Sequence, residues 1–287
     1  MKFVSFLHGG EVRAGVLDGD EIILLEEVGH HHLHNLSDLI KSSDNLLNLG
    51  QSHLMRSGVT RFKASEVVFA PVIHNPGKVI CLGLNYFDHA KEGGREKPTY
   101  PWFFLRAASS LVGHKAKAIL PKVSTQFDYE AELAVVIGKK CKHVRKENAL
   151  DYVFGYSCFN DISVRDYQKK TPQWTIGKNF DATGSFGPYL VTADELPEGG
   201  RGLSIRCRLN DEIVQDANTS DMIFHVEETI ELISECMTLE PGDVIVMGTP
   251  AGVGFARTPP LWLKDGDSVD IEIDNVGVLS NLVAAER

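Results

Sequence analysis

The sequence predicts a mainly β protein with some α-helix (α+β), in which a small β-rich N-terminal domain precedes a larger domain. Three observations lead to this prediction. Short apolar runs separated by Gly and Asp fill the first 25 residues, five further strand-like runs follow residue 78, and one segment has clear helical periodicity. The 287 residues suffice for a small domain joined to a large one.

The N-terminal domain is predicted to cover residues 1–72. Residues 4–25 (VSFLHGGEVRAGVLDGDEIILL) alternate apolar runs with turn residues, as antiparallel strands do. A helix is expected near residues 36–49, with an apolar stripe of Leu36, Leu39, Ile40, Leu46 and Leu47. Residues 70–77 (APVIHNPG) contain two prolines and a glycine, which favours a linker.

The larger domain, residues 73–287, is predicted to be rich in strands. These strands are VICLGL (79–84), YEAELAVVIG (129–138), LSIRCRLN (203–210), DVIVMG (243–248) and SVDIEID (268–274). A helix is expected over residues 221–237, where Ile223, Val226, Ile230, Ile233 and Met237 recur at three- and four-residue steps. Ser220 is the predicted cap at its start.

Composition excludes several classes of protein. The formal net charge of −10 disfavours a nucleic-acid partner, because phosphate contacts need a basic surface. No stretch approaches the roughly 18 apolar residues of a membrane span. The N-terminus reads as a strand and turn rather than a secretion signal, so no membrane association and a cytoplasmic location are expected.

Neither cysteine nor histidine spacing predicts a metal site. The cysteines are odd in number, scattered and without a C-x-x-C pair, which favours buried free thiols over a disulfide scaffold or a zinc ribbon; they are Cys81, Cys141, Cys158, Cys207 and Cys236. The histidine-rich stretch has no cysteine partners at ligand spacing, and a solvated loop is its better interpretation; it consists of His30, His31, His32 and His34.

Two acidic residues open the strand predicted at residues 129–138. Side chains alternate between the faces of a strand, so Glu130 and Glu132 would share one face. The apolar run that follows takes this strand into a core, where neighbouring carboxylates repel each other and lose solvation. They then need protons, basic partners or a cation, whereas at a partly exposed strand edge they would simply be solvated.

A third acid, Asp161, ends the apolar segment that starts at residue 152. If it converges with Glu130 and Glu132, the three carboxylates form a site of hard oxygen ligands suited to one Mg²⁺ or Mn²⁺ per chain. Zinc is less favoured, because no histidine is close in sequence and Cys158 would face away from Asp161. The sequence does not itself place Asp161 beside Glu130.

Six motifs over residues 78–287 resemble the fumarylacetoacetate hydrolase family, in the same order. They are GLNYFDHAKE (83–92), DYEAELAVVIGK (128–139), GYSCFNDISVRDYQ (155–168), WTIGKNFD (174–181), GDVIVMGTPAGVG (242–254) and GDSVDIEIDNVGVLSN (266–281). The family's E-x-E and later Asp are metal ligands, and they correspond to Glu130, Glu132 and Asp161. The resemblance also implies a mixed β-sandwich roll, commonly assembled as a homodimer.

The resemblance assigns roles to further residues. His89 and Glu92 would activate water, with Glu92 orienting the imidazole as a general base. Lys178 would stabilise developing negative charge. The substrate-binding residues would be Arg165, Gln168 and Thr249, together with Arg106, which replaces the lysine of the family's P-x-x-F-x-K pattern in PWFFLR. This replacement implies either a different substrate preference or a solvent-facing side chain.

The glycine-rich GTPAGVG (248–254) lacks the features of nucleotide-binding loops. It has no G-K-[ST] ending, and two prolines follow soon after it, so neither a P-loop nor a dinucleotide-binding turn is predicted. In the family this loop lines the active site, which lets Thr249 donate to a substrate carboxylate. A glycine-rich backbone can approach a ligand closely.

The reaction that the resemblance favours is metal-dependent hydrolysis of an acylpyruvate, R–CO–CH₂–CO–COO⁻, to pyruvate and a carboxylic acid, as in aromatic compound catabolism. The substrate would be a small anionic 2-oxo acid. The alternatives on the same site are decarboxylation of an oxaloacetate-like acid and isomerisation of an unsaturated 2-oxo acid, because one scaffold supports several chemistries. A non-catalytic binding protein is the remote alternative, since it would lack at least one of these ligands or catalytic residues.

Overall fold

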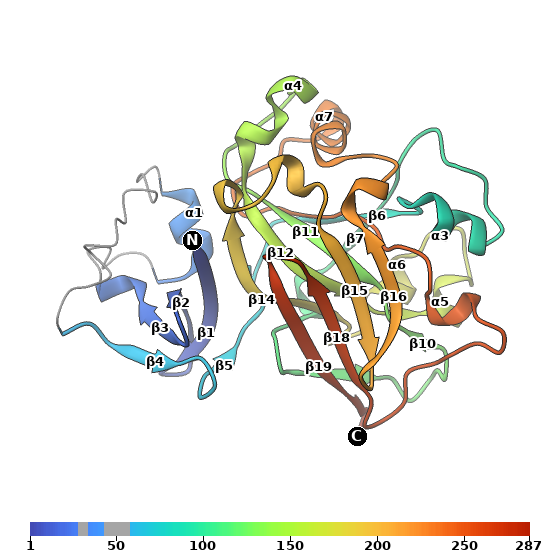
Figure 1. Ribbon diagram of the computed structural model, residues 1–287, viewed down its shortest axis with the longest axis horizontal. Coiled ribbons are helices and arrows are strands. Elements are labelled where there is room, and N and C mark those ends of the chain that lie inside the picture. The colour runs from blue at the N-terminus through green and yellow to red at the C-terminus, as the bar shows by residue number, and fades with distance from the viewer. Residues whose placement is uncertain (28–33, 43–57) are drawn as a thin grey trace.

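The computed structural model describes residues 1–27, 34–42 and 58–287. A long mixed sheet runs through the molecule (Figure 1) and has twelve strands among these residues. In order across the sheet they are β4 (Arg61–Lys63), β3 (Glu21–Leu24), β2 (Glu11–Asp18), β1 (Lys2–His8), β14 (Gly184–Thr192), β12 (Val153–Asp161), β11 (Ala131–Ile137), β17 (Val244–Val246), β6 (Val79–Gly83) and β7 (Trp102–Arg106), with β5 (Val68–Phe69) beside β1 and β8 (Leu111–Val112) beside β14.

A second sheet of five strands packs against one face of the long sheet. Its order is β16 (Glu212–Asn218), β15 (Ser204–Leu209), β18 (Ser268–Ile273), β19 (Gly277–Ala285) and β9 (Lys117–Leu120). A short ladder joins β10 (Phe127–Asp128) to β13 (Ser163–Val164). The helices are α1 (Leu36–Lys41), α3 (Phe87–Glu92), α4 (Lys146–Ala149), α5 (Arg165–Gln168), α6 (Thr175–Lys178) and α7 (Val226–Cys236).

The mainly β, mixed architecture expected from the sequence is confirmed, and each strand expected in the larger domain is present as β6, β11, β15, β17 or β18. No helix in the described part of the chain is long and apolar enough to cross a membrane.

The central strand β11 is buried along its whole length, as its sequence predicts. Leu133, Val135 and Ile137 face the core between the two sheets. Ala134 and Val136 face the opposite side, where N-terminal residues such as Phe3 pack. Because both faces are covered, a strand of this kind is apolar throughout, and its polar residues occur only where it begins.

The N-terminal strands continue the long sheet. β1 pairs with β14 in antiparallel register, with Phe3 opposite Leu190, and the blue N-terminal segment lies beside β14 in Figure 1. The predicted linker at residues 70–77 is not a free connection, because Val72 and Ile73 are at most 1% exposed. The domain boundary near residue 72 stays a prediction.

The predicted helix at residues 221–237 begins later than expected. α7 starts at Val226, and Ser220 lies in a separate 3₁₀ turn (Thr219–Asp221). The side chain of Asn218 accepts the backbone N–H of Ser220, and that of Asp221 accepts the backbone N–H of Asn218, so these two side chains close the turn. The prediction of Ser220 as the helix cap is therefore wrong.

Three smaller expectations have mixed outcomes. α1 confirms the start of the helix expected at residues 36–49, but most of its second half falls outside the described residues, as do His30, His31 and His32. His34 is exposed and pairs with Glu26. Four cysteines are buried thiols as expected, whereas Cys236, the last residue of α7, is exposed.

Candidate active site

Antiparallel pairing of β11 with β12 brings the three predicted metal ligands together. Ala131 lies opposite Asn160, so the start of β11 and the end of β12 share one edge of the sheet. The backbone N–H of Asp161 donates to the carbonyl of Glu130 at 3.0 Å. One oxygen each of Glu130, Glu132 and Asp161 lies within 4.8 Å of the others, and the three side chains are at most 4% exposed.

Two buried cations compensate part of this charge. The ammonium of Lys178, at the end of α6, donates to Asp161 Oδ2 at 2.6 Å and to Glu130 Oε2. Arg106 donates to Asp161 Oδ1 and, at 2.8 Å, to Thr183 Oγ1. Burial raises the pKa of Glu130, but Arg165 and Lys178 outweigh it and lower that pKa to about 2.

Glu132 is the least compensated of the three acids. Its Oε2 accepts the backbone N–H of Gly248 at 2.6 Å, and within the described ranges no Lys, Arg or His side chain forms an ion pair with it. Burial, and then the charges of Asp161 and Glu130, raise the pKa of Glu132 well above its usual range. A divalent cation held by these three oxygens would remove the repulsion, so the donor set fits Mg²⁺ or Mn²⁺.

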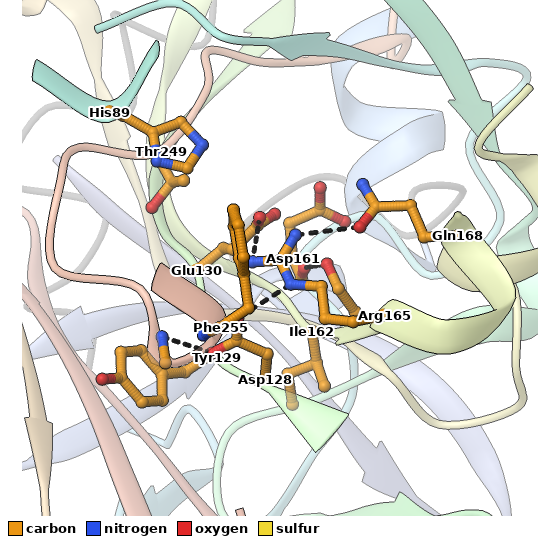
Figure 2. A network of polar contacts seen from close by, with 12 residues as sticks. His89, Asp128, Tyr129, Glu130, Asp161, Ile162, Arg165, Gln168, Thr249 and Phe255 are labelled. Atoms are coloured by element: carbon orange, nitrogen blue, oxygen red, sulfur yellow. Dashed lines mark hydrogen bonds and ion pairs between the residues drawn. The ribbon is translucent and has the colours of Figure 1, made fainter. Parts of the chain in front are cut away.

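Arg165 organises the other side of the centre (Figure 2). Its Nε donates to Asp128 Oδ2 at 2.8 Å, its Nη1 donates to Gln168 Oε1 at 3.0 Å, and its Nη2 lies 2.7 Å from Glu130 Oε1. The last contact is a buried ion pair. Asp128 also accepts the backbone N–H groups of Gly254 and Phe255, at 2.7 and 3.1 Å. It thereby ties Arg165 to the glycine-rich loop.

His89 and Glu92 form the pair expected from the sequence. Both lie on α3, and His89 Nδ1 is 2.7 Å from Glu92 Oε1, while Glu92 Oε2 accepts the N–H of Gly252 at 2.9 Å. A carboxylate at Nδ1 favours the tautomer with Nδ1–H, which leaves the lone pair on Nε2. His89 is 6% exposed and lines the pocket, so this lone pair is available to a bound ligand.

Thr249 is held with its hydroxyl proton free. Gln215 Nε2 donates to Thr249 Oγ1 at 2.8 Å and to the carbonyl of Pro250 at 2.8 Å. Asn85 fixes the same loop from the other side, because its amide donates to the carbonyl of Met247 at 2.7 Å. Because the hydroxyl accepts from Gln215, its own proton can be donated into the pocket.

A pocket of about 660 Å³ contains most of these residues. The predicted site residues that line it are His89, Glu130, Glu132, Arg165, Gln168, Lys178 and Thr249. Asp161 and Arg106 lie behind this lining. Arg106 is 3% exposed, so the interpretation that it faces solvent is wrong, and its guanidinium is occupied by Asp161 and Thr183.

Three polar residues of the site went unrecognised in the sequence. Asp128, Asn85 and Gln215 are each at most 2% exposed and position Arg165 or the loop around Thr249. Asp128 precedes Tyr129 in the very segment that contains the two glutamates, so the signal for it was present. Gln215 lies on β16, whose sequence gives no hint of this contact.

The fold and the site define a class of protein whose buried carboxylates, on a mixed β-roll, suit a divalent metal ion beside an imidazole–carboxylate pair. Residues 78–284 match the family described as fumarylacetoacetate (FAA) hydrolase C-terminal, and residues 1–38 match the one described as Rv2993c-like, N-terminal. The chain belongs to the fumarylacetoacetate hydrolase family.

Its relatives carry several activities. Over 221 residues it is 45% identical to human mitochondrial oxaloacetate tautomerase FAHD2A, covering 76% of this chain and 70% of that protein. It superposes on a fumarylacetoacetate hydrolase from Exiguobacterium antarcticum with 35% identity and a TM-score of 0.85, covering 100% of both chains. It is also similar to maleylpyruvate hydrolase from Sphingobium sp. SYK-6 (31% identity, TM-score 0.82, 100% of both chains), whose structure is also known with manganese(II) and pyruvate.

Proposed function

We propose that this protein is a divalent-metal-dependent tautomerase of small 2-oxo acids that interconverts the keto and enol forms of oxaloacetate. The observation that carries the proposal is a buried imidazole, His89, which lines a pocket whose buried cations, Lys178 and Arg165, can stabilise an enolate. Moving a proton between C3 and the 2-oxo oxygen needs one such group and no leaving group. The 45% identity to oxaloacetate tautomerases supports this choice.

The proposed proton transfer uses the chain's own residues. His89 Nε2 removes a proton from C3 of the keto acid, and Glu92 stabilises the imidazolium that forms. The electron pair of the C–H bond moves into the C2–C3 bond, and that of the carbonyl moves onto the 2-oxo oxygen. The imidazolium then returns the proton to this oxygen. Lys178 lies where it can neutralise the transient oxyanion, and Arg165 and Thr249 can hold the adjacent carboxylate.

Glu130, Glu132 and Asp161 would hold the metal ion, which we propose to be Mg²⁺ or Mn²⁺. When bound, the ion supplies Lewis-acid stabilisation of negative charge on the substrate oxygens.

Hydrolysis of an acylpyruvate is the second candidate, and the size of the pocket favours it. A cavity of about 660 Å³ belongs to the range of roughly 300–1,000 Å³ that holds drug-sized ligands, so it has room for an acyl chain beyond a four-carbon acid. In this reaction His89 would activate water instead of removing a carbon-bound proton. The similarity to maleylpyruvate hydrolase supports this alternative.

The deciding experiment follows the conversion of enol-oxaloacetate to the keto form by ultraviolet absorbance, after EDTA treatment and after Mg²⁺ or Mn²⁺ is added back. A metal-dependent acceleration that His89→Asn removes is the expected result. Pyruvate is measured in parallel, from oxaloacetate and from acetylpyruvate.

Each other outcome assigns the site differently. Pyruvate from acetylpyruvate without enol conversion would establish the hydrolase. Pyruvate and CO₂ from oxaloacetate would identify a decarboxylase. Metal binding without any turnover would leave isomerisation of another 2-oxo acid or a binding protein, and would reject the tautomerase.

A further inference from the structure

Two aromatic walls connect the acidic centre with the open side of the pocket. In the first wall, Phe104 lies 5.6 Å from Trp174, which stacks on Trp102 at 5.7 Å between ring centroids. Lys178 lies 5.0 Å from the Phe104 ring at the inner end, and Arg95 lies 5.5 Å from the Trp102 ring at the outer end. This wall therefore carries one buried cation and one exposed cation.

The second wall repeats this arrangement on a single ring, Phe255. The guanidinium of Arg165 lies 4.5 Å from its centroid, and the ammonium of Lys169 lies 4.6 Å from it. Arg165 is buried, whereas Lys169, the residue that follows α5, is exposed. Both cations line the pocket.

The exposed outer cations, Arg95 and Lys169, differ from the buried inner cations, Lys178 and Arg165, in their ion-pair partners. Lys178 and Arg165 each pair with Glu130, whereas Arg95 and Lys169 have no carboxylate within 4.0 Å in the described part of the chain. Burial, and then the positive charge of Arg165, lower the pKa of Lys169. Lys170 also lines the pocket, but its ammonium lies over the Tyr167 ring at 3.3 Å. Cations without carboxylate partners on one pocket are unexpected in a protein with a net charge of −10, because acidic partners are abundant elsewhere.

We propose that Arg95 and Lys169 bind a second carboxylate of the substrate and make the enzyme selective for 2-oxo dicarboxylates over 2-oxo monocarboxylates. This inference rests on the proposed function in one respect: it places the 2-oxo acid group at the inner end, beside Lys178 and Arg165. The distal carboxylate of a diacid then points toward Arg95 and Lys169. The aromatic walls contact the carbon chain between them and keep the charged groups apart from bulk water.

A binding experiment tests the inference without requiring turnover. The Mn²⁺-loaded protein is titrated calorimetrically with 2-oxoglutarate and with 2-oxopentanoate, in which a methyl group replaces the distal carboxylate. We expect the diacid to bind the wild type about tenfold more tightly or better, as a charge-assisted contact allows. The double variant Arg95→Gln, Lys169→Gln should lose this preference and bind 2-oxopentanoate within about twofold of the wild type.

Lys97→Gln is the matched control, because Lys97 is an exposed cation of the same segment as Arg95 and does not line the pocket. It should keep the preference for the diacid. Equal binding of the two acids by the wild type, binding of neither, or an equal loss for both acids in the double variant would overturn the inference. Mn²⁺ affinity, measured on each variant, verifies that the metal centre is intact.

A kinetic experiment separates this inference from the proposed function. With oxaloacetate as substrate, the double variant should have a KM about tenfold higher than the wild type and a kcat within about twofold of it. With the 4-methyl half-ester of oxaloacetate, which lacks the distal charge, neither KM nor kcat should change by more than about twofold. If the wild type converts neither compound, the tautomerase proposal fails, while the calorimetric preference still decides the role of Arg95 and Lys169. If kcat falls equally for both compounds, the two residues act in catalysis instead of selectivity.

Discussion

At the scale of single residues, the site contains more buried negative charges than buried positive charges. Four buried carboxylates face three buried cations: Asp128, Glu130, Glu132 and Asp161 against Arg106, Arg165 and Lys178. Lys178 is shared between Glu130 and Asp161, and Arg165 between Asp128 and Glu130, so the uncompensated charge falls on Glu132. Either a bound metal ion or a proton on Glu132 can therefore compensate this remaining negative charge.

Replacing Glu132 by Gln should separate metal binding from folding. The folded metal-free protein holds the Glu132 proton to a higher pH than the unfolded chain, because the pKa is raised in the folded state. Its stability therefore falls as pH rises above the unfolded pKa of about 4.3. At pH 7.5 without metal, Glu132→Gln should melt at the same temperature as the wild type or higher.

Thermal unfolding with and without saturating Mn²⁺ measures the other half of this prediction. The wild type should gain roughly 5 °C or more from the ion, because a ligand that binds only the folded state stabilises it. Glu132→Gln should gain almost nothing and should lose turnover. A variant that still gains the full shift would show that Glu132 is not a ligand.

His89 is the residue on which turnover depends most directly. His89→Asn removes the proton acceptor next to the pocket and should lower kcat about 10²–10⁴-fold. Mn²⁺ affinity should stay within about twofold, because His89 hydrogen-bonds to Glu92 and not to the three acids that would hold the metal ion. Stopped-flow enol conversion and calorimetric Mn²⁺ titration supply the two measurements. Unchanged kcat would exclude His89 as the acid–base group.

At the scale of elements, register determines which residues meet. The alternation along β11 predicted that Glu130 and Glu132 share a face, and the apolar run behind them predicted their burial. Their proximity to Asp161 depends on the pairing of Ala131 with Asn160, a contact between separate strands that no local pattern contains. The position of Arg106, 55 residues from Asp161, was unpredictable for the same reason.

Sequence patterns predicted best the features that lie within a single helix or strand. The strands of the larger domain and the His89–Glu92 pair on α3 are of this kind. The start of α7 was misjudged because Asn218 and Asp221 form a turn with their own backbone, and this competes with extending the helix upstream. The family resemblance, carried by motifs in order, supplied what the local patterns could not.

His114, in the connection between β8 and β9, contacts two strands that are distant in sequence. His114 Nδ1 accepts the N–H of Ser280 on β19 at 3.0 Å, and its ring lies edge-on to Phe69 of β5 at 4.9 Å. Burial, and then the charge of Lys115, lower the pKa of His114 to about 4. The unfolded chain binds this proton below about 6.5 and the folded chain only below about 4, so stability is lost as pH falls between these values.

His114→Asn keeps a hydrogen-bond acceptor but cannot titrate. The loss of free energy of unfolding between pH 7 and pH 4.5 should be about 1–3 kcal/mol smaller in this variant than in the wild type, after allowance for partial exposure of the ring. Urea unfolding at pH 7 and pH 4.5 measures the difference. His74→Asn, at an exposed histidine elsewhere in the chain, is the control and should leave the pH dependence unchanged. Equal acid sensitivity of wild type and His114→Asn would contradict the assignment.

At the scale of the whole molecule, β7 forms an edge of the long sheet that is apolar on its exposed side. Leu105 on this strand is 52% exposed and Ile176 on the adjacent α6 is 61% exposed, whereas Trp102 lies on the other face of the strand and lines the pocket. Exposed apolar edge strands invite pairing with another chain unless they are covered. We propose that this edge is covered by a second copy in a homodimer.

Leu105→Lys should shift the protein from the mass of two chains to that of one in light scattering coupled to size exclusion. The charge would be buried against the partner, which costs several kcal/mol when it is left unpaired. Val68→Lys, at a 62% exposed position on β5 in the N-terminal segment, should leave the dimer intact. A dimer unaffected by Leu105→Lys would place the interface elsewhere.

The pairing of β1 with β14 has a consequence for synthesis on the ribosome. β1 is made long before its partner strand, which begins only at Gly184, so this ladder closes late in synthesis. Until then Lys2 and Phe3 lack their partners on this side of β1, whereas Phe6 and Leu7 can already pair with β5, and the other side of β1 can pair with β2. Long-range pairing of this kind slows folding and exposes an unpaired strand in the nascent chain. We expect the yield of native protein to depend on translation speed and chaperone supply, and not only on the free energy of unfolding of the finished protein.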